Sequence, residues 1–373
     1  MKGKKLFRSL AFTAAIASLA MSLGCGEGKE EVDDRLYVAV IAKGSNSDYW
    51  DTVKKGSDEA GEEMNVRTSF SAPSGQSVVD SQKELVNQAV ADGANAIVIA
   101  PISYDAINDA LEAADKAGVP ILTIDSDTSF ANVKAKVTTN NDSAGAIAAM
   151  HARDIIGGKG KIAIINHSEE MQTTTRINGF TVELTGKTIE ELIAEGSTEE
   201  LKAGREEAQP EDTAQTDENT DDENADEADD KKEPEPDGIR IIENIYCGGV
   251  QERAKEETMK LISEHPDLKL IYSTNEPATI GVCQGIEEMH AQDQVQVVGF
   301  DCPFQLIKCI EDGTLDGTIV QDPYTMGYNG VTFAMKIAGG SFVDPMFDTG
   351  ATFVNSENIN SPYVQKLIYP LGK

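Results

Sequence analysis

The feature that most constrains this chain is a regular alternation of short apolar segments with longer amphipathic segments. Residues 36–42, LYVAVIA, are apolar throughout, as expected for a strand that is buried on both faces of a sheet. A helical pattern follows at about 49–63, and the strand-then-helix order recurs along most of the chain. Repeated units of this length predict an α/β fold in which helices cover both faces of parallel sheets.

The other expected elements keep this order. Further strands are expected near residues 66–71, 95–100, 120–124, 133–138, 161–166, 239–246, 268–273, 295–300 and 317–321. Further helices are expected at 78–91, 103–116, 142–156, 172–184, 250–264, 277–290, 303–311 and 324–338, with Asp142 as the cap of the helix at 142–156. The number of expected strands is too large for a single sheet, so we expect two lobes.

The first 24 residues have the layout of an export signal. Four basic residues lie within positions 2–8, and residues 9–23 form an uncharged run that is short for a membrane-spanning helix. Gly24 and Cys25 follow, which resembles a bacterial lipoprotein signal that would leave Cys25 acylated at the new N-terminus. The alternative is ordinary secretion with cleavage elsewhere. Residues 25–35 are expected to form the anchor and a flexible tether.

A strongly acidic break at about 186–237 interrupts the alternation. It holds 21 Asp and Glu against 5 Lys and Arg, and residues 206–237 contain no Val, Ile, Leu, Met or aromatic residue. Such a segment cannot offset its ordering entropy by burial, so we expect a disordered insertion. A calcium loop at 217–224 is a weaker alternative, because the run lacks the turn glycine of an EF-hand.

The overall charge excludes one class of partner. The chain has 32 Lys and Arg against 64 Asp and Glu, a net charge of −32. Nucleic acids and anionic lipids are bound through basic side chains, so neither is expected as a partner.

Polar and aromatic side chains gather where the expected strands end. Ligands of open parallel sheets bind beyond the carboxyl ends of the strands, so these positions are candidates for one site. They are Tyr49, Trp50, Asp125, Arg176, Asn275, Asp301 and Gln321. Carboxylates, amides and a guanidinium suit sugar hydroxyls, and aromatic rings cover the C–H faces of a sugar. The competing interpretation of any single one is a turn or helix cap, a core position or a surface ion pair.

Several motifs together resemble the sugar-binding proteins of bacterial ABC importers, in the ribose- and galactose-binding group that shares its fold with lac-type repressors. The resemblance covers about residues 36–185 and 238–360. Its marks are SDYW after the first strand, VPILTIDSD (119–127), TTNNDSAG (138–145), RINGF (176–180), STNEPATIG (273–281), VVGFD (297–301) and TIVQDPYTMG (318–327).

The resemblance implies the periplasmic binding protein type 1 fold, with two Rossmann-like lobes joined by three crossing strands and the ligand between them. It implies lobe one at 36–139 plus 322–349, and lobe two at 140–321 plus 350–373. It also implies stacking aromatics at Tyr49 and Trp50, lobe carboxylates at Asp125 and Asp301, an arginine at Arg176 and amides at Asn275 and Gln321. It further implies a hinge-region polar residue at Asn140 and a ligand-binding position at Ser47.

The chain departs from ribose binders of this group at four positions. Ser47 and Ala100 each replace an Asn, Ser126 stands where an Arg follows the carboxylate, and Gly249 replaces an aromatic residue. These changes put ribose itself in doubt as the ligand. His167, near the end of strand 161–166, is expected at the surface, with the cleft as the alternative.

Other chemistry has little support. The four later cysteines, Cys247, Cys283, Cys302 and Cys309, form no C-x-x-C motif and are expected to be free thiols, with a 302–309 disulfide as an alternative. GGKGK (157–161) lacks the spacing of a P-loop, and there is no nucleophile elbow or zinc-protease motif. Neither a cofactor nor a metal is expected, and we do not expect an enzyme.

The sequence therefore predicts a monomeric extracytoplasmic lipoprotein that captures a monosaccharide or similar small polyol. It would deliver this ligand to an ABC permease in the membrane to which the lipid anchors it. A ligand-sensing subunit for a chemoreceptor or sensor kinase is the alternative.

Overall fold

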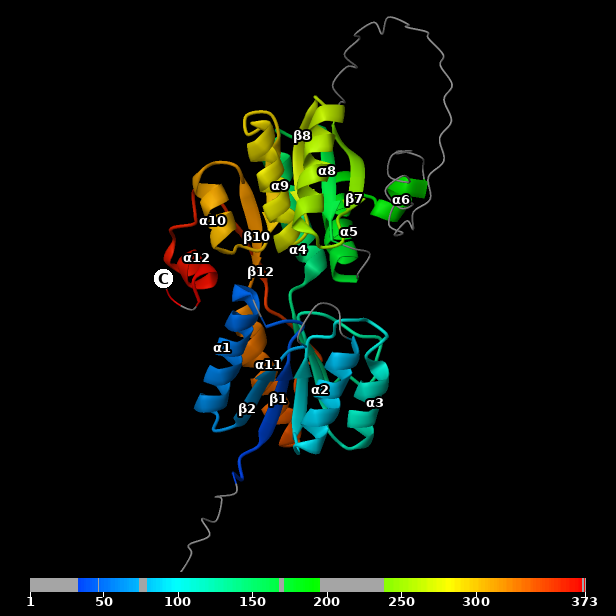
Figure 1. Cartoon of the computed structure of the whole chain (residues 1–373), viewed down its shortest axis with the longest axis vertical. Coiled ribbons are helices and arrows are strands. Elements are labelled where there is room, and N and C mark those ends of the chain that lie inside the picture. Colours follow the sequence, from blue (N-terminus) through cyan, green and yellow to red (C-terminus); the bar gives the residue numbers. More distant parts are fainter. Residues whose placement is uncertain are drawn as a thin grey trace, which may run out of the picture. The chain divides into compact units, whose positions relative to one another are not determined.

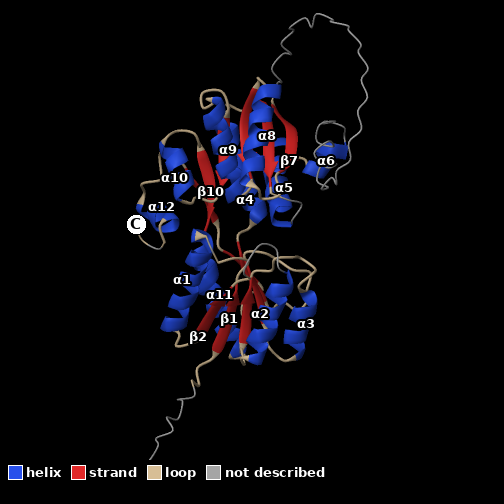
Figure 2. Ribbon diagram, viewed as in Figure 1, coloured by secondary structure: helices blue, strands red, loops and turns tan. Residues whose placement is uncertain are grey.

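Two six-stranded sheets organise the computed structural model, which describes residues 33–45, 47–73, 79–167, 171–194, 238–370 and 372. The strand orders are β11-β5-β4-β3-β1-β2 and β12-β10-β9-β8-β6-β7. Every neighbouring pair is parallel except β10 and β12, which are antiparallel. Each sheet and its helices form one lobe (Figures 1 and 2), which confirms the predicted two-lobe α/β fold.

The bounds of the elements are close to those expected from the sequence. The strands are β1 (Tyr37–Ile41), β2 (Arg67–Ser71), β3 (Ala96–Ile99), β4 (Ile121–Ile124), β5 (Ala135–Thr138), β6 (Gly160–Asn166), β7 (Ile239–Tyr246), β8 (Leu268–Ser273), β9 (Gln296–Phe300), β10 (Gly317–Gln321), β11 (Met346–Asp348) and β12 (Ala351–Val354). The helices are α1 (Asp48–Glu63), α2 (Val79–Ala91), α3 (Asn108–Lys116), α4 (Asn141–Ile155), α5 (Met171–Thr185), α6 (Ile189–Ala194), α8 (Gln251–Glu264), α9 (Glu276–Met289), α10 (Phe304–Glu311), α11 (Pro323–Ala338) and α12 (Pro362–Ile368).

The first strand shows why its sequence is apolar throughout. Successive side chains of a strand point to opposite faces of the sheet. Val38 and Val40 pack with residues of α1 and α11, whereas Ala39 and Ile41 pack with residues of α2 and α3. Both faces are thus buried under helices (Figure 2), so a polar side chain in this strand would need a hydrogen-bonding partner within the core.

Close helix pairs hold each lobe together through glycines. A Cβ added at Gly145 of α4 would lie inside van der Waals distance of the Arg176 carbonyl oxygen, and one at Gly179 of α5 would meet the carbonyl of Asp142. In the first lobe, Gly56 of α1 and Gly327 of α11 make the equivalent approach. The two lobes therefore use the same packing device, and in the second lobe it fixes the backbone of Arg176.

Within the described residues the chain passes between the sheets three times. The crossings follow β5, β10 and β11, at about residues 139–140, 322 and 349–350. Two of the crossings meet, because the backbone N–H of Asn140 donates to the side chain of Asp348 at 2.9 Å. The crossings predicted from the resemblance are present.

The structure describes the first residues of the acidic break, 186–194. Residues 189–194 form helix α6, and Ile189 is buried. Thr188 and Glu191 form a reciprocal capping box, in which each side chain accepts from the other's backbone N–H at 3.2 and 2.8 Å. This T-x-x-E signal makes the expectation of disorder from residue 186 wrong at its start. Residues 195–237, including the calcium-loop alternative at 217–224, lie outside the described residues.

The structure differs from the predicted elements in three further respects. Asn140, not Asp142, caps α4, because its side chain accepts from the backbone N–H of Ser143 at 3.1 Å. Helix α3 begins at Asn108 rather than 103, after a turn in which Ser103 accepts from the backbone N–H of Ala106. Strands β11 and β12 and helix α12 were not predicted, and β11 has only three residues. The expected signal segment 1–24, Cys25 and the tether as far as residue 32 lie outside the described residues.

Candidate functional site

Eight of the nine side chains singled out from the sequence line one pocket between the two lobes. The pocket takes residues from the carboxyl ends of strands in both sheets and from the first turns of the helices that follow. The predicted residues in its lining are Ser47, Tyr49, Trp50, Asp125, Arg176, Asn275, Asp301 and Gln321. The topology brings them together because parallel strands present their carboxyl ends at one edge of each sheet. Ligand contact by each residue stays a prediction.

The lobes present equivalent carboxylates to this pocket. Asp125 follows β4 and Asp301 follows β9, and these strands occupy the same place in their sheets. Both residues have positive φ angles, 60° and 65°, which cost energy outside glycine. A threonine hydroxyl of the neighbouring strand donates to each aspartate carbonyl at 2.7 Å. These hydrogen bonds from the neighbouring strands help to hold both aspartates in a strained conformation, in which they line the pocket.

In the first lobe, Asp125 is held ionised by its neighbours. The hydroxyl of Tyr49 donates to Asp125 Oδ1 at 2.7 Å, and Lys43 Nζ lies 3.0 Å from Oδ2. Burial by itself raises the pKa of Asp125, but the charge of Lys43 and the Tyr49 hydrogen bond hold that pKa below its ordinary value. The carboxylate is therefore a charged acceptor in a desolvated place.

An aromatic pair lies beside this carboxylate. The rings of Tyr49 and Trp50 meet edge to face, with centroids 5.0 Å apart. Ser47 caps helix α1 by accepting from the backbone N–H of Trp50 at 3.4 Å, so its position also serves the helix. The cap orients the first turn of α1, which carries both rings.

In the second lobe, Arg176 is 6% exposed and lies among fixed partners. It donates to the carbonyl oxygen of Thr274 at 2.7 Å and to the side chain of Asn141 at 2.7 Å. Its guanidinium lies over the ring of Phe300, 3.7 Å from the centroid. This side chain is therefore oriented before any ligand arrives.

Gln321 links this arginine to the second carboxylate. Its Nε2 donates to Asp301 Oδ1 at 2.8 Å, and its Oε1 faces Arg176 Nη2 at 3.4 Å. Burial raises the pKa of Asp301, and the positive charge of Arg176 only partly offsets that effect. When ionised, the Asp301 carboxylate can accept hydrogen bonds from ligand hydroxyls. Such hydroxyls would replace the water that burial removes from the carboxylate.

Two predicted residues remain, Asn275 and Asn140, and only Asn275 lines the pocket. Asn275 caps α9 by accepting from the backbone N–H of Ala278 at 3.2 Å, and it also lines the pocket. Asn140 does not line this pocket. It lies in a neighbouring cavity that shares Asp125 with the pocket. Helix capping accounts for the Asn140 side chain.

Sequence reasoning did not assign six residues of the pocket lining, and three of them stand beside strand ends that were already considered. Lys43 follows the first strand directly, and Glu276 follows Asn275, so both were adjacent to positions already singled out. His167 also lines the pocket, which corrects its expected surface position. Ligands of parallel sheets bind beyond the carboxyl ends of the strands. Extending the search at each strand end by one or two residues would have found all three side chains.

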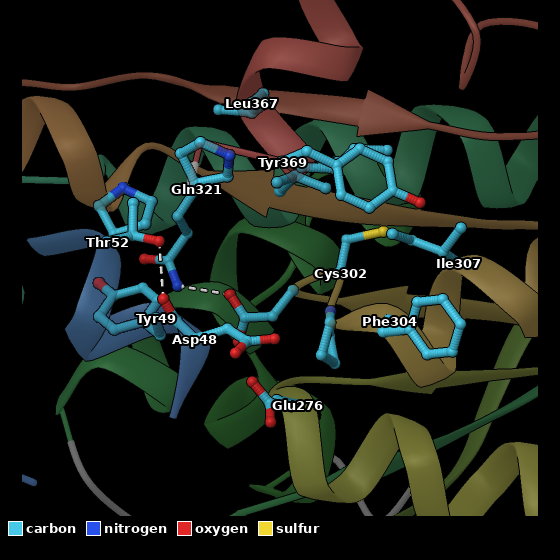
Figure 3. Close-up of a pocket in the computed structure, with 16 residues that line it drawn as sticks. Asp48, Tyr49, Thr52, Glu276, Cys302, Phe304, Ile307, Gln321, Leu367 and Tyr369 are labelled. Atoms are coloured by element: carbon cyan, nitrogen blue, oxygen red, sulfur yellow. Dashed lines mark hydrogen bonds between the residues drawn. The ribbon is translucent and has the colours of Figure 1, made fainter. Parts of the chain in front are cut away.

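Glu276 is the pocket residue whose pKa has the clearest consequence for the stability of the protein. Burial raises its pKa from 4.5 to about 7, helped by the negative charges of Asp301 and Asp48. Asp48 and Glu276 both line a neighbouring pocket, which Figure 3 shows. Because the folded-state pKa is the higher one, the protein loses stability as the pH rises from about 4.5 through 7.

Replacing Glu276 with Gln should therefore stabilise the ligand-free protein at about pH 8 and leave it unchanged at about pH 4. We expect a gain of about 1–2 kcal/mol, discounted because the side chain is partly exposed to solvent. Thermal unfolding at the two pH values measures it. The exposed Glu357, changed to Gln, is the matched control. An equal effect of the Glu276 change at both pH values would contradict a raised pKa.

The cysteines of the described residues are free thiols, as expected. The Cys309 thiol is hydrogen-bonded with Cys283. Cys302 follows Asp301 directly, and burial raises the pKa of its thiol to about 12, which disfavours the reactive thiolate. No disulfide joins 302 and 309.

Comparison with known proteins establishes the family. A model of the periplasmic binding protein domain matches residues 38–222 and 177–341. The chain belongs to the periplasmic binding protein family. This membership confirms the resemblance noted in the sequence, and it implies a location outside the cytoplasm. Among the described helices, none combines the length and apolar character that crossing a bilayer requires.

Individual relatives agree with this family. The D-allose-binding periplasmic protein of Escherichia coli is 21% identical over 83% of this chain and 86% of its own length. The ribose import binding protein of Salmonella typhimurium is 24% identical over 72% of this chain and 76% of its own length. These relatives are solute-binding proteins, which confirms that the chain is not an enzyme, and they do not favour the sensing alternative.

Solved structures give the same result. An ABC transporter solute-binding protein from Agrobacterium vitis, with bound D-fucose, is 27% identical with a TM-score of 0.70 and covers 89% of this chain and 100% of its own. A carbohydrate transporter solute-binding protein from Agrobacterium radiobacter, in complex with D-arabinose, is 25% identical with a TM-score of 0.71 and covers 90% and 99%.

Proposed function

We propose that this protein captures a monosaccharide or similar small polyol between its two lobes and delivers it to the permease of an ABC transporter. The observation that carries the proposal is the pocket between the lobes, where Asp125 and Asp301 are held in equivalent strained conformations. The sugar-bound solved structures support the ligand class.

The polar groups of the pocket suit the hydroxyls of a neutral ring. Asp125 and Asp301 accept hydrogen bonds, Arg176 donates a charge-assisted fork, and Asn275 and Gln321 can do both. Trp50 offers an apolar face to the C–H groups of the sugar. Since Asp125 and Arg176 are already oriented by Tyr49 and Thr274, little ordering is needed when the ligand binds.

Binding residues on both lobes couple occupancy to conformation. A ligand that touches both lobes stabilises the closed arrangement relative to the open one, so it shifts that equilibrium. The three crossings are the segments that would bend. We assign lobe one to residues 36–139 plus 322–349 and lobe two to 140–321 plus 350–373, because β11 pairs with β5 and β12 pairs with β10.

Delivery requires the protein to stay near its permease. We propose that residues 1–24 direct export and that Cys25 carries the lipid which anchors a monomeric protein to the membrane. The Gly-Cys pair after an uncharged apolar run supports this part of the proposal. Metabolic labelling with a radioactive fatty acid should mark the parent protein and not its Cys25→Ser variant. Labelling of both would contradict the anchor.

A ligand screen tests the proposed function. Thermal unfolding of the mature protein should be measured against pentoses, hexoses, their deoxy derivatives and acyclic polyols. A sugar present at 100 times its dissociation constant should stabilise the protein by about 2.7 kcal/mol. Calorimetry of the best ligand would then give the affinity, and amino acids serve as a control class. If amino acids stabilised the protein and no sugar did, the proposed ligand class would be wrong.

A further inference from the structure

The turn that follows β7 has room for His167 only because it is built from glycine. Gly248 and Gly249 have φ angles of 64° and 71°, a region that other residues rarely adopt. A Cβ added at Gly249 would lie 2.5 Å from Nε2 and 2.7 Å from Cδ2 of His167. The same addition at Gly248 would meet nothing within 4 Å. The imidazole therefore occupies the space directly over Gly249.

The backbone beneath this imidazole is firmly held. Asn166 is fully buried, and its Oδ1 accepts from the backbone N–H of His167 at 2.8 Å and from the Thr274 hydroxyl at 2.7 Å. Its carbonyl oxygen accepts from the backbone N–H of Cys247 at 2.8 Å. The end of β6 is thus tied to the residues that follow β7 and β8, so the position of the His167 Cα is fixed from both sides.

The ring also lies in the wall of the proposed sugar pocket. Among the described residues of that lining, the rings of Tyr49 and Trp50 come from the first lobe, and His167 supplies the ring of the second lobe. A sugar ring has two faces and a rim of hydroxyls. A ligand held against Trp50 would meet, from the other lobe, a flat side chain whose nitrogens can hydrogen-bond.

We propose that His167 is a specificity-determining residue of the sugar site, and that Gly249 is glycine so that the imidazole can reach it. The inference rests on the proposed function and names the ligand more closely. The sugar has an apolar face for Trp50 and a hydroxyl that pairs with the His167 imidazole. A site built around such a pair discriminates against an analogue that lacks the hydroxyl, because the hydrogen bond between the hydroxyl and the imidazole cannot then form.

A double-mutant cycle tests the link between the two residues. Titration calorimetry with the best sugar from the ligand screen should show His167→Ala weakening binding about 10- to 100-fold. Gly249→Ala should weaken it to a similar degree, because its Cβ displaces the imidazole. In the His167→Ala background the Gly249 change should have little further effect. Independent effects that multiply in the double variant, or unchanged affinity in His167→Ala, would overturn the inference.

Two further variants separate this result from general damage. Gly248→Ala introduces the same kind of backbone strain without a clash, so its affinity should match that of the parent. Loss of affinity in Gly248→Ala equal to that in Gly249→Ala would show that turn strain, not the imidazole, is responsible. His167→Phe keeps a ring but no nitrogen, so it should narrow the difference between the sugar and its deoxy analogues. If the parent bound no sugar at all, the proposed function would fail rather than this inference.

Discussion

Replacing Arg176 with Met should weaken sugar binding by about 2–4 kcal/mol, or roughly 30- to 1000-fold in dissociation constant. The side chain is buried at the pocket and donates to the carbonyl of Thr274. Its loss removes a charge-assisted donor to the ligand and leaves the carboxylate of Asp301 without the positive charge that lowers its pKa. The Asp301 carboxyl should then take up a proton more readily and become a poorer acceptor for hydroxyls.

Titration calorimetry of the Arg176→Met variant checks this expectation. The exposed Arg240 on β7, changed to Met, is the matched control and should bind like the parent. Thermal unfolding without ligand should accompany both variants, because Arg176 also bonds within its own lobe. A folded Arg176→Met variant with parental affinity would show that the guanidinium does not serve the ligand.

Replacing Gly145 with Ala should lower the free energy of unfolding by about 1–3 kcal/mol. In an exposed helix this change would stabilise by about 1 kcal/mol, because alanine has the higher helix propensity. Here the added Cβ would overlap the carbonyl oxygen of Arg176 on α5, and a backbone atom cannot rotate away as a side chain does. Helices α4 and α5 must separate, which also moves Arg176 relative to the pocket.

Chemical denaturation measures this effect, and Gly339 provides the control. Gly339 follows α11 with a φ angle of −81°, and an added Cβ there would have ordinary contacts of 3.4 and 3.5 Å. Gly339→Ala should therefore be neutral or stabilising by up to about 1 kcal/mol. Equal destabilisation by the two changes would mean that the close approach of α4 and α5 is not the cause.

Local pattern was sufficient to predict most of the fold. Strands such as β1 are buried on both faces, so their sequences are apolar throughout and their bounds are recognisable. The elements that escaped prediction are short or depend on a partner. Strand β11 has three residues and exists through its pairing with β5, which lies about 200 positions earlier in the chain. Helix α6 was missed although its capping box was legible at Thr188 and Glu191.

The site was partly predictable for a related reason. A polar residue after a buried strand stands out in the sequence, so Asp125 and Asp301 could be named before their surroundings were known. What those residues do depends on neighbours from other elements. Lys43 pairs with Asp125, and the charge of Asp48 acts on Glu276. These interactions arise between segments that are distant in sequence, and no local pattern specifies them.

The sequence by itself determined the two-lobe α/β architecture and the strand ends at which the polar residues gather. It did so because strand and helix periodicity and burial on both faces are local properties of the chain. Only the tertiary structure decided that Asn140 serves as a helix cap and that His167 lines the pocket over Gly249. Those outcomes depend on distances between atoms of different elements, which folding sets and a linear pattern does not contain.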